Sequence, residues 1–140
     1  ASDGGFYIGM ICDQRNSTSS ETIAQELQTP LVAEQSYQSY VDLATAADDG
    51  YQNGALAGAG RFIIIGRMAA SACLGSAPDQ QILYDSGPVT NAGWETFDIK
   101  FTPTKGWTHL FITMSDNPSA CYINSSNILI DNLQPMVPVP

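Results

Sequence analysis

Hydrophobic and polar residues alternate along short stretches of the chain, and this alternation predicts β-strands. The clearest case is residues 94–102, where Phe97, Ile99 and Phe101 share one face and polar residues share the other. Clusters of Gly, Pro, Asn and Asp separate the stretches. The predicted strands are residues 5–12, 22–29, 35–45, 60–68, 80–86, 94–102, 107–115 and 127–134. About eight such strands are typical of an all-β, antiparallel β-sandwich of the jelly-roll type.

One stretch, residues 18–28, is open to a second interpretation. Ile23 and Leu27 have the spacing of neighbours on one face of a helix, and alternation of period two fits the same residues. Pro30 ends the stretch after only about two helical turns. We therefore favour a strand.

The length of 140 residues is that of a single domain. We expect the sandwich to span residues 1–134. Residues 135–140 form a proline-rich tail, which we interpret as an extended exit from the domain because proline cannot join a central strand. The longest aliphatic run, residues 62–65, is far shorter than the roughly 20 residues that span a bilayer, so no membrane insertion is expected.

Charge narrows the possible partners. The net charge is −9, and charged residues make up only 14% of the chain. An acidic surface repels phosphate backbones, which argues against nucleic acid as a partner. The polar residues are mainly Ser, Thr, Asn and Gln, a composition common in extracellular β-sandwiches. The low surface charge also suits a subunit that packs against copies of itself.

The three cysteines indicate the compartment. Cys73 and Cys121 both lie in predicted loops rich in Ser and Ala, and we predict a disulfide between them, worth about 4 kcal/mol on the chain-entropy model. Cys12 is then buried or paired outside the chain. The alternative is three reduced thiols in a cytosolic protein.

Several stretches, in this order, carry a family resemblance: residues 4–10, 23–31, 83–86, 94–103 and 128–133, the last reading Ile-Leu-Ile-Asp-Asn-Leu. Over most of residues 4–134 the chain resembles the jelly-roll, carbohydrate-binding-module-like domains of secreted and cell-surface bacterial proteins of the Bacteroidetes type. The resemblance implies an extracellular or cell-surface location and glycan binding. Those domains usually open with an additional Asn-x-x-Phe-Glu strand, so whether the sheet is complete within this chain is left open.

The resemblance also implies a possible structural calcium ion, with Asp131 as a ligand. Calcium takes six to eight oxygen ligands. The alternative is that Asp131 is a polar residue at a strand end whose carboxylate accepts hydrogen bonds from backbone amides. No other cofactor is expected.

Catalysis finds little support in the sequence. His109 is the only histidine, and the chain has no G-x-S-x-G motif of a serine hydrolase. Its Asp and Glu residues could supply a glycosidase pair, but no spacing singles out two of them. We therefore expect a protein that is not an enzyme.

Glycan-binding modules of this fold hold sugars on exposed aromatic rings, with amides and carboxylates bonding to the hydroxyl groups. If Phe97, Ile99 and Phe101 face inward, the other face of their strand is free to bind. The predicted ligand-binding residues are Trp94, Trp107, Tyr40, Asp42, Asp98, His109, Tyr51 and Asn53. The alternative for the two tryptophans is that they anchor the edge of the core.

The sequence thus predicts a non-catalytic extracellular module for glycan recognition or cell-surface adhesion, whose partner is a polysaccharide or a cell-surface glycan. The alternative is a structural subunit of an extracellular fibre or surface assembly, whose copies are joined by strand addition with residues 134–140 as a candidate donor. If Phe62 and Ile64 are core residues, Ile63 and Ile65 face outward or into a second layer. Facing outward, they would offer an apolar surface for such an assembly. The alternative is that this strand is buried on both faces.

Overall fold

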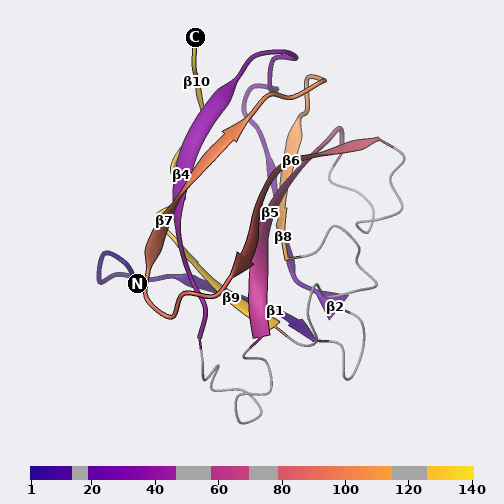
Figure 1. The fold of residues 1–140 in the computed structure, drawn as a ribbon. Helices are drawn as coiled ribbons and strands as arrows, with labels where there is room; N and C mark the ends of the chain where they lie inside the picture. The colour runs from indigo at the N-terminus through magenta and orange to yellow at the C-terminus, as the bar shows by residue number, and fades with distance from the viewer. Residues whose placement is uncertain (14–18, 47–57, 70–78, 115–125) are drawn as a thin grey trace.

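The computed structural model describes residues 1–13, 19–46, 58–69, 79–114 and 126–140 (Figure 1). All regular secondary structure in these segments is β-strand, which confirms the predicted all-β class. Within them no helix of the length and apolarity needed to cross a membrane is found.

Every predicted strand is present, with ends that differ by a few residues. The strands are β1 (Ile8–Asp13), β2 (Ser19–Ser20), β3 (Thr22–Glu26), β4 (Tyr37–Ala44), β5 (Gly58–Arg67), β6 (Gln80–Val89), β7 (Glu95–Phe101), β8 (His109–Thr113), β9 (Ser126–Asp131) and β10 (Val137–Pro138). The short strands β2 and β10 are additions to the eight predicted.

The eight long strands form two antiparallel four-stranded sheets. Sheet I has the order β1-β9-β4-β7, and sheet II has the order β3-β8-β5-β6. Successive long strands mostly switch between the sheets, and this order is the jelly-roll arrangement. The start of β5 also pairs in parallel with β9, which joins the two sheets at one corner. The predicted fold is confirmed.

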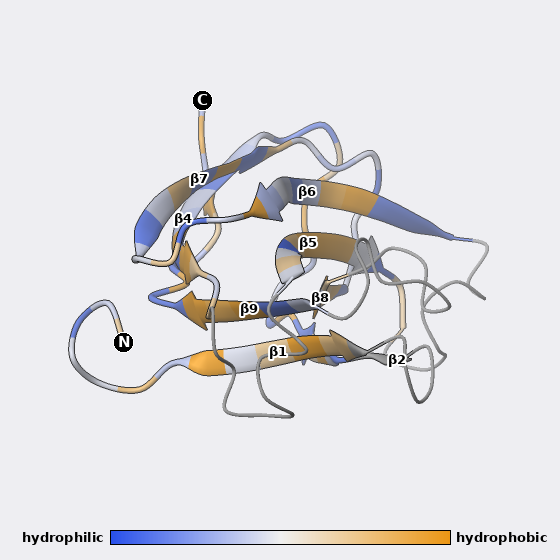
Figure 2. Ribbon diagram, turned by 60° about the horizontal axis from the view of Figure 1, so that its bottom comes forward, coloured by the Kyte–Doolittle hydropathy of each residue, from blue (hydrophilic) through white to orange (hydrophobic). Residues whose placement is uncertain are grey.

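The core lies between the sheets and follows the alternation read from the sequence. Figure 2 shows hydrophobic residues concentrated along β1, β5 and β9. Of the predicted inner layer, Ile99, Phe101 and Leu110 are buried, and Phe97 and Ile112 pack against them while partly buried. Burial of such side chains stabilises the fold by roughly 1.5–3 kcal/mol each.

Strand β5 is buried on both faces. Phe62 and Ile64 point into the core, whereas Ile63 and Ile65 form a separate buried cluster with Phe111 of β8. A second buried layer, one of the two arrangements expected for Ile63 and Ile65, is therefore found.

Strand β3 settles the ambiguous stretch in favour of a strand, but its side chains are exposed along its whole length. Among the described residues β3 pairs only with β8, so it is an edge strand of sheet II. Ile23 sits opposite Ile112 and is exposed, since no other described strand pairs with β3 on its far side.

Cys12, one residue before the end of β1, is buried in the core and forms a disulfide bond. The alternative of three reduced thiols therefore does not hold for Cys12. Cys73 and Cys121 lie outside the described residues, and the disulfide between them stays a prediction.

Candidate functional site: a groove beside β4

The candidate site begins with the pairing of β4 and β7. Tyr40 lies opposite Asp98, and Gln38 lies opposite Lys100. Because side chains alternate between the faces of a sheet, these four side chains share the outer face of sheet I. Val41 and Leu43 of β4 point into the core.

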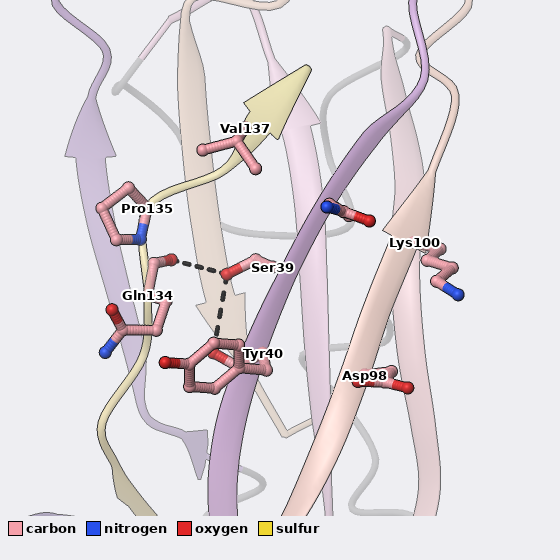
Figure 3. Close-up of a pocket in the computed structure, with 8 residues that line it drawn as sticks. Ser39, Tyr40, Asp98, Lys100, Gln134, Pro135 and Val137 are labelled. Atoms are coloured by element: carbon pink, nitrogen blue, oxygen red, sulfur yellow. Dashed lines mark hydrogen bonds between the residues drawn. The ribbon is translucent and has the colours of Figure 1, made fainter. Parts of the chain in front are cut away.

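The C-terminal tail runs along the other side of β4. The backbone N–H of Gln134 donates to the carbonyl oxygen of Tyr40 at 3.0 Å, and the hydroxyl of Ser39 donates to the carbonyl oxygen of Gln134 at 2.6 Å. Farther along, β10 pairs with the beginning of β4. Figure 3 shows Gln134, Pro135 and Val137 on one side of β4, and Asp98 and Lys100 on the other.

Two adjoining hollows lie over this part of sheet I. The first has a volume of about 410 Å³ and is lined by Gln38, Ser39, Tyr40, Asp98, Lys100, Gln134, Pro135 and Val137. The second, of about 450 Å³, is lined by Ser36, Tyr37, Gln38, Lys100, Phe101, Thr102, Val139 and Pro140. Gln38 and Lys100 line both hollows, so we treat the two as one site, the β4 groove. Each volume is within the roughly 300–1,000 Å³ of small-molecule sites.

The β4 groove combines one exposed aromatic ring with several hydrogen-bonding groups. The side chain of Tyr40 is 42% exposed and offers an apolar ring with a hydroxyl at its tip. Gln38 supplies an amide, Asp98 a carboxylate and Lys100 an ammonium group, and all three are exposed. Lys100 forms no ion pair with any described residue, so its three N–H donors can reach a ligand.

Trp94 lies immediately before β7. It is partly exposed, and its ring meets that of Tyr7 edge to face, with 5.8 Å between the centroids. Four residues separate Trp94 from Asp98, roughly 13 Å along the strand. Trp94 is therefore beyond the groove but in line with it.

Asp42 lies between Trp94 and the groove, and its carboxylate is already bonded within the protein. It accepts a hydrogen bond from the hydroxyl of Thr96 at 2.6 Å and one from the side-chain amide of Asn132 at 3.2 Å. Hydrogen bonds from Thr96 and then Ser2 lower the pKa of Asp42 below its ordinary value of 3.8, against the opposing effect of burial, and Asn132 lowers it further. Asp42 thus lies on the predicted face of the sheet, where its carboxylate binds other side chains of the protein.

Asp42→Asn is expected to flatten the acid side of the stability profile. Because the pKa of Asp42 is lowered in the folded state, its stabilising contribution is fully present above the unfolded pKa of 3.8 and is lost as the pH falls through the lower folded value. Below about pH 4 the free energy of unfolding should fall more steeply for the native protein than for the variant. Urea titrations over this range measure both slopes, and equal slopes would contradict the assignment.

Asp131, the predicted calcium ligand, accepts hydrogen bonds from other groups of the protein. Its Oδ2 atom accepts from the backbone N–H and the hydroxyl of Ser2, and its Oδ1 atom accepts from the backbone N–H of Asn132. Bonding to the Ser2 backbone is the main reason why the pKa of Asp131 is lowered.

The described residues around Asp131 do not by themselves make up a calcium site. Among them no group of three or more Asp, Glu, His or Cys side chains is placed to hold a metal, and calcium takes six to eight oxygen ligands. Calcium binding at Asp131 stays a prediction.

Trp107 is not a ligand-binding residue, in contrast to the prediction. Its side chain is only 1% exposed and belongs to the core. The indole N–H donates to the side-chain oxygen of Gln81 at 2.9 Å, and the ring lies so close to Gly66 that a Cβ atom there would be 2.6 Å from it. Trp107 precedes β8 instead of lying within it, so the alternation of β8 does not apply to it.

The remaining predicted site residues lie elsewhere. His109 is on β8 in sheet II, so it cannot act together with the β4 groove, and its Nδ1 atom is 2.8 Å from the Thr108 hydroxyl. Tyr51 and Asn53 lie outside the described residues. Of the predicted set, the structure brings Tyr40 and Asp98 together, with Asp42 on the same face and Trp94 just before β7.

The prediction omitted three groups that line the groove. Gln38 and Lys100 alternate in phase with Tyr40 and Asp98, so the strand pattern contained the signal that would have found them. Gln134 comes from the tail, and nothing in the sequence pairs it with β4.

Comparison with known proteins adds fold likenesses only. No family model matches the chain, and no curated protein matches it. A solved structure described as "CBM4 structure and function" aligns with a TM-score of 0.48 and 12% identity, covering 84% of this chain and 61% of that one. One described as "Family 16 Carbohydrate Binding Module-2" aligns with a TM-score of 0.45 and 19% identity, covering 86% and 72%. The chain thus spans about three fifths of the first structure.

Proposed function

We propose that this protein is a non-catalytic, extracellular module that binds a glycan in the β4 groove. The observation that carries the proposal is the exposed ring of Tyr40, set among the polar side chains of Gln38, Asp98 and Lys100. A sugar ring has an apolar face of C–H groups and a rim of hydroxyl groups. The apolar face suits the ring of Tyr40, and the hydroxyl groups suit the surrounding donors and acceptors.

The composition of the groove supports a role without catalysis. Glycoside hydrolysis uses two carboxyl groups on either side of the scissile bond. Among the described residues that line the groove, Asp98 alone carries a carboxyl side chain. A groove with one carboxylate is suited to holding a sugar by hydrogen bonds.

The disulfide of Cys12 supports an extracellular or cell-surface location, because disulfides persist in oxidising compartments. A glycan-binding module at the cell surface would serve adhesion. Its partner is then a polysaccharide or a cell-surface glycan.

Tyr40→Ala is expected to weaken glycan binding about tenfold, a loss of ~1.4 kcal/mol, because the sugar loses its apolar platform. Glycan array screening of the native protein identifies the probe, and calorimetry with that glycan measures the affinity of each variant. Thermal unfolding should show little change, because Tyr40 is partly exposed and outside the core cluster.

Ile82→Ala is the matched control, since Ile82 is 45% exposed but lies on β6 in sheet II. It should bind as the native protein does. Binding to no glycan on the array would refute the proposed function, and undiminished binding by the Tyr40 variant would refute its location.

One observation favours the second candidate, a structural subunit of an extracellular assembly. Exposed apolar side chains gather where β1 and β3 leave one side of the sandwich uncovered: Phe6, Tyr7, Ile8, Ile23 and Leu133, around a hollow of about 420 Å³. Phe6 is 97% exposed. Exposed apolar patches of this kind mark contact surfaces. A mass well above 15.0 kDa by light scattering would favour assembly.

A further inference from the structure

The tail completes an edge of sheet I that the long strands leave open. On the side of β4 away from β7, β9 pairs only with Asp42–Ala44. The earlier part of β4 would be unpaired there, and unpaired strand edges recruit strands from other chains. After Asn132, which has a positive φ of 52°, the tail continues in the direction of β9 along this open part of β4 and is antiparallel to it.

The hydrogen-bond phase of the tail decides which of its backbone groups face outward. The N–H of Val139 donates to the carbonyl oxygen of Ser36 at 2.9 Å, so the backbone of Val139 faces β4. Backbone direction alternates along an antiparallel pair, and Val137 therefore faces β4 as well. The nitrogen atoms of Pro138 and Pro140 point away from β4, in the plane of the sheet and toward its open side.

Both outward positions are thus held by the residue that has no N–H group. From Val137 to Pro140 the outer edge of the tail offers carbonyl oxygens and no backbone donor. Proline is tolerated in sheets on edge strands, where it stops a further strand from pairing.

We propose that the tail is a strand cap: Val137 and Val139 close the open edge of β4, and Pro138 and Pro140 keep another chain from adding to the closed edge. The tail also lines both hollows of the β4 groove, so the cap leaves that groove open to a ligand that is not a protein strand. Strand addition with the tail as donor, considered from the sequence, would require the tail to leave its own sheet. The proposal does not depend on glycan binding.

The double variant Pro138→Val/Pro140→Val tests the outward edge, because it adds N–H donors there and leaves the inward hydrogen bonds in place. Sedimentation over a concentration series should show self-association at least tenfold tighter than that of the native protein. The matched control, Val137→Ile/Val139→Ile, adds no outward donor and should sediment like the native protein. If the Pro138→Val/Pro140→Val protein associates no more tightly than the native protein, the proposal is overturned.

Val139→Pro tests the inward contact. It removes the N–H that bonds to Ser36, so the tail should detach and expose the edge of β4. Tenfold tighter self-association than in the native protein is expected. A folded Val139→Pro protein that associates no more than the native one would show that the edge of β4 needs no cap, and would also overturn the proposal.

Discussion

Trp107→Ala is expected to lower the free energy of unfolding by about 3–5 kcal/mol, the range for deleting a large buried aromatic side chain. The ring of Trp107 is packed against the backbone of Gly66 on β5, so alanine would leave a cavity at the contact between β5 and the segment before β8. The substitution would also leave the Gln81 side-chain oxygen without the indole donor. Urea denaturation monitored by far-UV circular dichroism measures the change.

Trp94→Ala is the matched control, because it deletes the same side chain from a partly exposed position just before β7. Its cost in stability should be at most about 1 kcal/mol, as for surface substitutions generally. Equal losses for the two variants would mean that the two tryptophans do not differ in burial as described here. The comparison also separates a tryptophan that holds the fold from one that lies in line with the groove.

Trp107 shows where alternation stops being informative. The period of two holds within β8, and Leu110 and Ile112 follow it. Trp107 lies two residues before the first residue of β8. Its backbone N–H donates a hydrogen bond to the carbonyl oxygen of Lys105 in a tight turn. Outside a strand the period gives no side-chain direction, and the tertiary packing against Gly66 decides burial.

The long strands could be predicted because each carries its own local signal. Alternation and turn residues define them without reference to the rest of the chain, and eight strands suffice to suggest a jelly roll. Which strand lies at an edge is a property of the whole sheet. For this reason β3 was found, while the exposure of Ile23 was not.

The candidate site divides in the same way. Tyr40 and Asp98 followed from the alternation of their strands, although their contact needed the register of β4 against β7. The tail side of the groove depends on a hydrogen bond between Ser39 and Gln134, which are 95 residues apart. Proline argued against any strand in the tail, and the structure shows why one is tolerated there, since the nitrogen of Pro138 faces away from β4.

Cys12→Ala is expected to lower the free energy of unfolding by about 2–5 kcal/mol, the usual cost of losing a native disulfide in a small domain. Cys12 is the last residue but one of β1 and lies opposite Ser126, at the start of β9, so its disulfide constrains the first strand of sheet I. Urea denaturation of the oxidised protein measures the loss. Added reductant should lower the stability of the native protein and leave that of the variant almost unchanged.

The other two cysteines provide the control for this prediction. If the partner of Cys12 is another cysteine of this chain, one of Cys73→Ala and Cys121→Ala should cost about as much as Cys12→Ala, whereas the other should cost far less. Combining Cys12→Ala with the costly variant should add little, because both break the same bond and their effects cannot be additive. If Cys73→Ala and Cys121→Ala were equally costly and Cys12→Ala nearly neutral, the pairing expected from loop composition would be right and the disulfide of Cys12 would be refuted.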